Sequence, residues 1–222
     1  GKTTLVLESL VPALRARLAG EPLPAHVRDV DGAGISRVNL IDATPIGVNV
    51  RSTVATYSGV LDELRRAFAR TEEAQAAGLK PGAFSYNTGS LRCPTCDGTG
   101  QITLDVQFLP DVDIECTECR GSRYGAQAAS ILRDGLSLPD IMAMSVDEAR
   151  VAVRGLKKAG ALLETLSGLG LGYLTLGEAT PALSGGEAQR LKLASEMGRR
   201  QDGALFVFDE PTIGLHPDDV QV

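Results

Sequence analysis

The fold is decided by the stretch Leu183-Ser184-Gly185-Gly186-Glu187-Ala188-Gln189-Arg190, which is followed by Asp209-Glu210-Pro211-Thr212. Ser184 and Glu187 have the spacing of a capping box, which starts an α-helix. Gly185 and Gly186 leave the first backbone N–H groups of that helix unshielded, and the positive end of the helix dipole favours a phosphate. The stretch therefore predicts a helix from Ser184 to about Arg200 whose start can bind an anion, although a well-started helix without that role fits the same residues.

A strand is predicted over Ala204 to Phe208, directly before the two acids. Its residues are apolar, as expected of a central parallel strand that is buried on both faces. Ligands of parallel sheets bind at the carboxyl ends of the strands, so Asp209 and Glu210 would lie at a ligand site. Asp209 would hold Mg²⁺, and Glu210 would orient or deprotonate an attacking water. The alternative is an acidic exit from the strand that has no chemical role.

The chain begins with Gly1-Lys2-Thr3-Thr4, which matches the last residues of a phosphate-binding loop. In such loops a Lys contacts the β- and γ-phosphates and a hydroxyl binds Mg²⁺, and Lys2 and Thr3 would supply these groups. The tetrapeptide alone is a weak signal, because an ordinary helix can begin in the same way. With no initiator Met and no preceding strand, we expect a fragment whose two ends belong to one nucleotide-binding module.

The composition is that of a soluble globular protein, with 43% apolar and 23% charged residues among 222. No run of about 18 apolar residues occurs, so no membrane span is predicted, and the features of a signal peptide are missing. The net charge of −6 argues against a surface that attracts nucleic acid as a whole. A cytoplasmic protein is expected, and the length allows either one large core or one core plus an inserted module.

Four cysteines form two pairs, Cys93 with Cys96 and Cys116 with Cys119, in the spacing C-x₂-C-x₁₉-C-x₂-C. Two turns that each offer two thiolates can close a tetrahedral four-sulfur site, which is the geometry that zinc prefers. Protein ligands would fill all four positions, so the zinc would be structural. Metal is favoured over disulfides or free core thiols, which remain the alternatives.

The region around the cysteines shows no clear surface for DNA. Between Phe84 and Gly125, six acids outnumber the three basic residues Arg92, Arg120 and Arg123. That balance does not by itself make a phosphate-binding surface. The three arginines lie next to the cysteine pairs and could form one local cluster, but no DNA-binding residue is identified.

The predicted fold class is α/β, with four segments along the chain: a core segment (1–83), a zinc-binding module with a β-ribbon over Gln101 to Phe108 (84–125), a helical subdomain (126–182) and a returning core segment (183–222). Apolar spacing and chain breakers predict the remaining elements. These are a helix ending near Gly20, a strand over Val38 to Ile41, a helix around Gly59 to Ala77, and helical stretches from Ala126 that are broken at Gly135 and Pro139 and continue through Ser145 to Arg154 and Gly160 to Leu169.

The order of these motifs resembles the ATP site of ATP-binding-cassette (ABC) ATPases, in which a glycine-rich signature helix precedes a strand that ends in two acids. Within that class, the chain is similar to the C-terminal module of the UvrA family, the damage-recognition subunit of bacterial nucleotide excision repair. The similarity covers nearly the whole chain and is specific, because the four-cysteine spacing lies within the ABC order. It is carried by the cysteine pairs and by Arg51-Ser52, Ala55 to Tyr57, Lys80 to Asn87, Phe108 to Asp111, Leu174 to Gly177, Leu183 to Arg190, Asp209 to Thr212 and Gly214 to His216.

The resemblance implies an ABC-type P-loop ATPase core with an inserted zinc-binding module and a helical signature subdomain. It implies ATP, Mg²⁺ and Zn²⁺ as cofactors, with ATP hydrolysis coupled to recognition of damaged duplex DNA and hand-over to a UvrB-like partner for incision. In this class the signature of one module faces the ATP of another, so a second ABC module in the same chain and a homodimer are implied, and the fragment alone would hydrolyse ATP poorly. By this resemblance ATP and Mg²⁺ would be bound by Gly1, Lys2, Thr3, Thr4 and Asp209, and the catalytic residue would be Glu210. The ATP of the opposing module would face Ser184, Gly185, Gly186, Glu187 and Gln189. Zinc would be bound by Cys93, Cys96, Cys116 and Cys119.

One departure from the family pattern lies after the strand at Val38 to Ile41. The family has Asp-Gln-Ser-Pro-Ile-Gly there, whereas this chain has Asp42-Ala43-Thr44-Pro45-Ile46-Gly47. The Gln normally reaches the Mg²⁺ and the attacking water, and Ala43 cannot. A UvrA-like paralogue that protects an antibiotic producer against DNA-binding drugs is therefore an alternative, as is a zinc scaffold without ATPase activity. A transporter's nucleotide-binding domain is disfavoured, because transporter cassettes are more compact before the signature and carry no zinc module.

Overall fold

The chain folds into two compact units in a computed structural model that describes residues 1, 4–104, 112–198 and 201–209. Unit 1 combines residues 1–45 with residues 184–222, and unit 2 is formed by residues 46–183. Unit 2 is therefore inserted into unit 1 between Pro45 and Ser184. The segments 84–125 and 126–182 both fall within unit 2, together with residues 46–83, and the four-segment division stays a prediction.

Unit 1 contains a two-stranded parallel sheet. Its strands β1 (Arg37–Ile41) and β6 (Ala204–Phe208) pair in register, from Arg37 with Ala204 to Ile41 with Phe208. A π-helical segment (Thr4–Leu10) leads into α1 (Val11–Ala19), and α9 (Gly185–Met197) is the signature helix. Because the strands are parallel, their carboxyl ends meet at one edge of the sheet, with Asp42 and Asp209 just beyond them.

The core of unit 1 is formed by α1 and the sheet. Val11 and Leu14 of α1 pack with Val38 of β1, and the partly buried residues Val6, Val30, Ile35, Leu205 and Val207 surround them. The prediction that β6 is buried on both faces is wrong: its residues are only half-buried, and Phe208 is 44% exposed. Among the described residues β6 pairs with β1 alone, so its other edge has no neighbouring strand to cover it.

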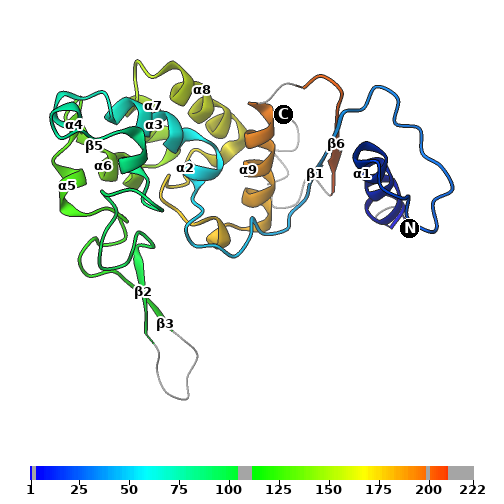
Figure 1. The fold of residues 1–222 in the computed structure, drawn as a ribbon, viewed down its shortest axis with the longest axis horizontal. Coiled ribbons are helices and arrows are strands. Elements are labelled where there is room, and N and C mark those ends of the chain that lie inside the picture. Colours follow the sequence, from blue (N-terminus) through cyan, green and yellow to red (C-terminus); the bar gives the residue numbers. More distant parts are fainter. Residues whose placement is uncertain (2–3, 105–111, 199–200, 210–222) are drawn as a thin grey trace. The chain divides into compact units, whose positions relative to one another are not determined.

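Unit 2 is mainly helical (Figure 1). Its helices are α2 (Val54–Tyr57), α3 (Val60–Phe68), α4 (Glu72–Ala76), α5 (Ala126–Ala129), α6 (Leu138–Ala143), α7 (Val146–Ala152) and α8 (Lys157–Leu166), with 3₁₀ turns at Pro81–Phe84 and Thr180–Ala182 and a π-helical segment at Ser167–Leu171. Its antiparallel strand pairs are β2 (Gln101–Leu104) with β3 (Val112–Glu115), and β4 (Leu132–Arg133) with β5 (Leu136–Ser137). The β2–β3 pair confirms the predicted ribbon up to Leu104, and residues 105–108 lie outside the described part.

Two local predictions for unit 2 are wrong. The helix expected from Gly59 to Ala77 is divided into α3 and α4, because Thr71 caps α4 and its hydroxyl accepts a 3.3 Å hydrogen bond from the N–H of Ala74. Pro139 does not break a helix but lies in the first turn of α6, after the N-cap Ser137. A proline is tolerated there because the first N–H groups of a helix have no intrahelical partner.

Buried tyrosines connect the cysteine-containing segment to the helices of unit 2. The hydroxyl of Tyr86 lies 3.0 Å from the hydroxyl of Thr53 and donates a 3.0 Å hydrogen bond to the carbonyl oxygen of Arg51. The rings of Tyr86 and Tyr124 meet edge to face at 5.9 Å. These contacts fix the position of the first cysteine pair relative to α2.

None of the described helices has both the length and the apolar character needed to cross a bilayer.

Candidate nucleotide site and metal centre

The signature helix begins as its sequence predicts. The N–H of Glu187 donates a 3.3 Å hydrogen bond to the hydroxyl of Ser184, and the carboxylate of Glu187 accepts a 2.7 Å hydrogen bond from the N–H of Ser184. This reciprocal pair is a complete capping box. Gly186 is buried in the first turn of the helix.

Gln189 connects the signature helix to both strands of unit 1. Its side chain is buried, and the amide nitrogen donates hydrogen bonds to the carbonyl oxygens of Ile41, at 3.1 Å, and Asp209, at 2.8 Å. Ile41 is the last residue of β1, and Asp209 follows the last residue of β6. The N–H of Asp209 also donates a 3.1 Å hydrogen bond to Ile41. One side chain thus fixes the two strand ends relative to α9.

Lys192, one turn further along α9, holds the segment that follows β1. Its ammonium group forms an ion pair with the carboxylate of Asp42 and donates hydrogen bonds to the carbonyl oxygen of Thr44, at 2.8 Å, and to the hydroxyl of Thr44, at 2.9 Å. Burial alone would raise the pKa of Asp42. The hydrogen bonds from Lys192 and Thr44, together with the charge of Lys192, outweigh burial and lower that pKa below its ordinary value.

Ala43 lies against the first residue of the signature helix. A β-carbon built on Gly185 would be 3.1 Å from the carbonyl oxygen of Ala43 and 3.2 Å from its β-carbon. A larger residue at position 185 would therefore press on this segment. The short Ala43 side chain and Gly185 together allow the close approach of the segment to α9.

The other residues predicted for the nucleotide site are partly described. The carbonyl oxygen of Gly1 accepts a 3.1 Å hydrogen bond from the N–H of Leu5, and Thr4 is exposed at the start of the first helical segment. Lys2, Thr3 and Glu210 lie outside the described residues. Of the predicted residues in unit 1, the structure brings Asp209 and Gln189 together and places Ser184, Gly185, Gly186 and Glu187 at the helix start.

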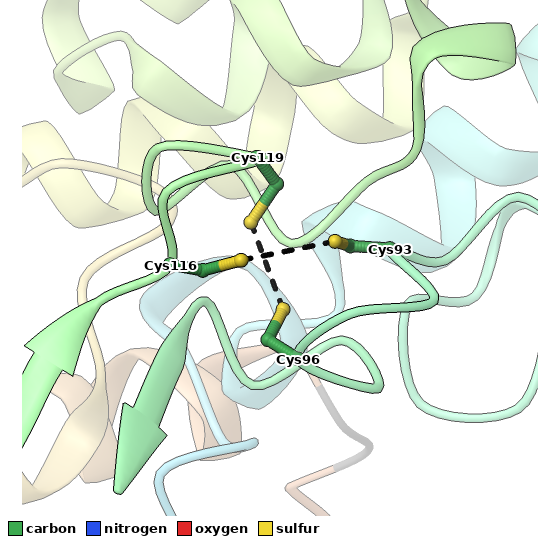
Figure 2. A group of neighbouring side chains, drawn as sticks. All are labelled: Cys93, Cys96, Cys116 and Cys119. Atoms are coloured by element: carbon green, nitrogen blue, oxygen red, sulfur yellow. Dashed lines mark hydrogen bonds between the residues drawn. The ribbon is translucent and has the colours of Figure 1, made fainter. Parts of the chain in front are cut away.

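The four cysteines converge on one point in unit 2 (Figure 2). All four side chains are buried, and their sulfur atoms lie within 4.8 Å of one another. The Sγ atoms of Cys93 and Cys116 are 3.9 Å apart, and those of Cys96 and Cys119 are 3.6 Å apart. A tetrahedral zinc site with Zn–S bonds of about 2.3 Å requires sulfur atoms about 3.8 Å apart. The cysteines therefore fit a tetrahedral metal ion, and the geometry does not match disulfides.

The two cysteine turns have nearly the same backbone. Each has positive φ angles at the two residues after its second cysteine, which are Asp97 and Gly98 in the first turn and Arg120 and Gly121 in the second. The N–H of Gly100 donates to the sulfur of Cys96 at 3.3 Å, and the N–H of Arg123 donates to the sulfur of Cys119. Such N–H donors stabilise thiolates, the form that binds a metal.

The pKa values of two cysteine thiols move in opposite directions. Burial acts to raise the pKa of Cys96, but the N–H of Gly100 and contacts with Cys119 and Cys93 lower it to about 7. Burial raises the pKa of Cys119 to about 12, despite the N–H of Arg123. A site with one readily formed thiolate and further thiols beside it is suited to releasing protons as a metal binds.

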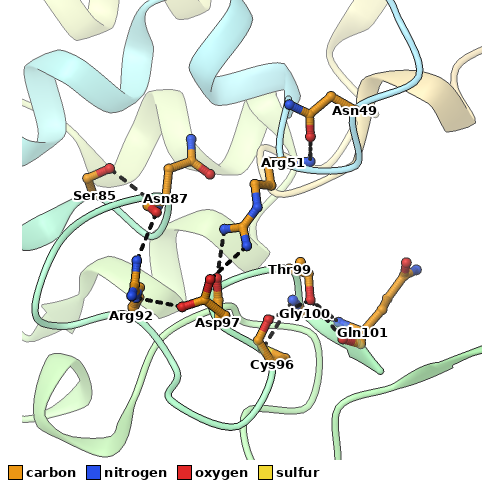
Figure 3. A network of polar contacts seen from close by, with 10 residues as sticks. All are labelled: Asn49, Arg51, Ser85, Asn87, Arg92, Cys96, Asp97, Thr99, Gly100 and Gln101. Atoms are coloured by element: carbon orange, nitrogen blue, oxygen red, sulfur yellow. Dashed lines mark hydrogen bonds and ion pairs between the residues drawn. The ribbon is translucent and has the colours of Figure 1, made fainter. Parts of the chain in front are cut away.

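The arginines near the cysteines do not form one exposed cluster. Figure 3 shows Asp97 between Arg51 and Arg92, with carboxylate oxygens 3.0 Å and 2.9 Å from their guanidinium nitrogens. The guanidinium group of Arg51 also donates a 2.7 Å hydrogen bond to the carbonyl oxygen of Asp97. Arg123 is buried, while Arg120 and Arg123 line a hollow of about 520 Å³ beside α6. The acid at position 97 thus neutralises part of the positive charge in this region.

Sequence reasoning missed Lys192, Asp97 and the buried position of Arg123. A usable signal for Lys192 was its spacing, since Gln189 and Lys192 lie three residues apart and so share one face of α9. The spacing gives no partner for either residue, because Asp42 and Asp209 are far away in the sequence. Asp97 and Arg123 lie in the cysteine turns, where only the folded backbone reveals which side chains point inward.

The chain is similar to known proteins over nearly its whole length, although no family model matches it. UvrABC system protein A from a Synechocystis species is 44% identical over 99% of this chain and 23% of that protein. The proteins of the same name from Bacillus subtilis and Thermus thermophilus are 43% and 42% identical over the same shares. The crystal structure of UvrA2 from Deinococcus radiodurans superposes with a TM-score of 0.87 at 41% identity, over 100% of this chain and 27% of that one. The chain thus spans about a quarter of the length of these relatives.

Proposed function

We propose, from the premise that 99% of this chain aligns with about a quarter of UvrABC system protein A at 42–44% identity, that it is part of an ABC-type ATPase that recognises DNA damage in nucleotide excision repair. The observation that carries the proposal is the position of Gln189. Its amide joins the signature helix to the carboxyl ends of β1 and β6, where parallel sheets bind their ligands.

The nucleotide roles follow from the resemblance together with this geometry. Gly1, Lys2, Thr3 and Thr4 would hold the phosphates and Mg²⁺, Asp209 would bind Mg²⁺ at the end of β6, and Glu210 would orient or deprotonate the attacking water. Mg²⁺ neutralises the charge that develops on the phosphates when it is bound. The position of Asp209 is supported by its backbone hydrogen bonds to Ile41 and Gln189.

The start of α9 is proposed to face the ATP of a second module. Ser184, Gly185, Gly186 and Glu187 combine a satisfied cap with the positive end of a 13-residue helix. Gln189 is engaged with Ile41 and Asp209, so its proposed role is to position the helix and the strand ends relative to each other. The second module would lie in the same chain, and two chains would form a homodimer.

The metal centre is proposed to be structural. Cys93, Cys96, Cys116 and Cys119 would provide four ligands, which leaves no position for a substrate or water. A bound zinc ion would link the two cysteine turns and so hold the base of the β2–β3 ribbon. The proposed partners are damaged duplex DNA and a UvrB-like protein, and the proposed location is the cytoplasm.

The test uses the complete gene in a bacterium that lacks its own UvrA protein. Expression should restore survival after ultraviolet irradiation, and the Glu210→Gln variant should not restore it although its amount in the cell is unchanged. An exposed substitution, Lys158→Met, serves as the matched control. Failure of the unaltered gene to restore survival, at normal protein levels, would refute the repair function.

A second candidate is a UvrA-like paralogue that protects against DNA-binding drugs, which is favoured by Ala43. The corresponding family Gln would reach Mg²⁺ and water, whereas the Ala43 side chain ends against the start of α9. The same bacterium, exposed to a DNA-intercalating drug instead of ultraviolet light, separates the two functions. Survival of the drug without survival of the irradiation would favour the paralogue. If the complete protein binds zinc but shows no ATP turnover that is lost in the Glu210→Gln variant, it would instead be a zinc scaffold without ATPase activity.

A further inference from the structure

Arg123 occupies the position in the second cysteine turn that Gly100 occupies in the first. Each residue follows the second cysteine of its pair by four positions, and each has a positive φ angle, 78° for Gly100 and 70° for Arg123. Each donates its N–H to the sulfur of that cysteine. The carbonyl oxygen of each also accepts a hydrogen bond from the first cysteine of the other pair, at 3.0 Å from Cys116 and 2.9 Å from Cys93.

The backbone at this position favours glycine, and only one of the two turns has it. A β-carbon on Gly100 would lie 2.9 Å from the carbonyl oxygen of Gly121, so no side chain fits in the first turn. Arg123 places a long charged side chain at the same left-handed conformation, which is unfavourable for every residue except glycine. Because glycine would satisfy the backbone, the side chain of Arg123 requires an explanation of its own.

The guanidinium group of Arg123 is buried without enough partners. The residue is only 6% exposed, and its Nε and Nη1 atoms have no hydrogen-bond partner in the described part of the chain. The group lies over the ring of Tyr86, with 5.2 Å between the guanidinium carbon and the ring centroid. A cation–π contact offsets only part of the cost of burying a charge. A second source of negative potential is needed nearby.

The cysteine sulfurs lie beside Arg123. Its N–H donates to the sulfur of Cys119, and its carbonyl oxygen accepts from the N–H of Cys93. Its side chain runs past Gly100, where a built β-carbon would lie 3.2 Å from the γ-carbon of Arg123, and the N–H of Gly100 donates to the sulfur of Cys96. Four thiolates around a divalent ion carry a net charge of about −2. The positive charge of Arg123 and the negative charge of the occupied centre are then each buried beside an opposite charge.

We propose that Arg123 is the built-in countercharge of the four-cysteine metal centre, and that it strengthens metal binding by balancing the charge of the thiolates. It acts on the centre through space and provides no ligand. The inference concerns metal affinity alone and does not rest on the proposed repair function.

The test compares Arg123→Gly with Arg120→Gly in the complete protein. Both substitutions replace a residue of positive φ in the same turn by glycine, so both relieve backbone strain. Only Arg123→Gly removes the buried charge, since Arg120 is exposed. Competition with a chromophoric chelator should show zinc affinity lowered about tenfold or more for Arg123→Gly, the range found for residues that support metal ligands. Arg120→Gly should keep the affinity of the unaltered protein.

Two further variants keep the result decisive if Arg123→Gly folds poorly. Arg123→Gln removes the charge and keeps most of the side chain, and it should also lose affinity. Arg123→Lys keeps the charge and should retain more affinity than the glutamine variant. Equal zinc affinity for Arg123→Gln and Arg123→Lys, or an equal loss for Arg120→Gly and Arg123→Gly, would overturn the proposal. Both results are independent of ultraviolet survival and of ATP turnover.

Discussion

The side-chain amide of Gln189 donates a 2.8 Å hydrogen bond to the carbonyl oxygen of Asp209, so the signature helix directly holds the residue that follows the second strand of unit 1. The same amide reaches Ile41 at the end of the first strand. A displacement of α9 would therefore shift both strand ends together. Movements of the helix would in this way be transmitted to the edge of the sheet at which ATP is proposed to bind.

Gln189→Leu should destabilise the protein and lower its ATP turnover. The substitution keeps the size of the side chain but removes both hydrogen bonds of the buried amide, at a cost of about 1–3 kcal/mol. The carbonyl oxygen of Ile41 keeps the N–H of Asp209 as a donor, so most of the cost should fall on the carbonyl oxygen of Asp209. Denaturant unfolding of the complete protein measures the first effect, and steady-state ATP hydrolysis measures the second. Gln127→Leu is the control, because Gln127 is exposed on α5. An unchanged free energy of unfolding of the Gln189 variant would show that the two hydrogen bonds contribute nothing to stability.

Lys192→Met should destabilise the protein by about 1–3 kcal/mol at neutral pH, since it removes the charged partner of Asp42 and two hydrogen bonds to Thr44. The folded-state pKa of Asp42 is below the ordinary value of 3.8. The contribution of the Asp42 carboxylate to the free energy of unfolding is therefore present above about pH 4 and is lost as the pH falls through the lowered pKa. Unfolding measured from pH 7 to pH 3 should show the difference in stability between the two proteins becoming smaller toward the acidic end, where the hydrogen bonds to Thr44 remain. A constant difference over that range would assign the effect to those hydrogen bonds and to packing, not to the ion pair.

Gly98→Ala should disrupt the first cysteine turn, whereas Gly135→Ala should be tolerated. Both glycines have positive φ angles, 78° and 83°. A β-carbon on Gly98 would lie 1.8 Å from the carbonyl oxygen of Tyr86, while one on Gly135 would meet nothing within 4 Å. Gly135→Ala should therefore cost about 1–2 kcal/mol from backbone strain alone. Gly98→Ala should cost more and should also lower the zinc content, which elemental analysis measures. Equal losses of stability and equal zinc contents for the two variants would mean that the chain avoids the clash with Tyr86 without any cost in free energy.

Cys116→Ser should lower the zinc content of the complete protein by about one ion per chain, because a structural site needs all four of its ligands. The cysteine turns should then become sensitive to protease, and treatment of the unaltered protein with a strong chelator should have the same effect. Thr95→Ala is the control: the Thr95 hydroxyl donates a hydrogen bond to the carboxylate of Glu118 across the two turns, but Thr95 provides no sulfur. An unchanged zinc content of the Cys116 variant would place the metal elsewhere.

The metal centre could be predicted from the sequence because its ligands come in two short turns. The spacing within each turn brings two thiols together locally, and the folding of unit 2 has only to bring the two turns to each other. The start of α9 was predictable for a similar reason, since Ser184 and Glu187 form their capping box within one helical turn. In both cases the information is local.

The roles of Gln189 and Arg123 were beyond the sequence because they depend on distant partners. Gln189 was expected to face the ATP of another module, and the prediction stays untested, but its amide is engaged by strand ends that lie far from it in the chain. Arg123 was grouped with Arg92 and Arg120 as a basic cluster. Its burial against the ring of Tyr86 follows from a left-handed backbone conformation, which an arginine in the sequence does not suggest.

The contact between Ala43 and Gly185 has a consequence for how unit 1 acquires its fold. The chain leaves unit 1 just after Ala43 and returns just before Gly185, and these two points touch. For unit 1, the whole of unit 2 is therefore a closed loop with its ends already joined. The entropy of closing a loop grows only with the logarithm of its length. Lengthening or shortening unit 2 by tens of residues would thus change the stability of unit 1 little, and such an insertion point tolerates the gain and loss of whole modules.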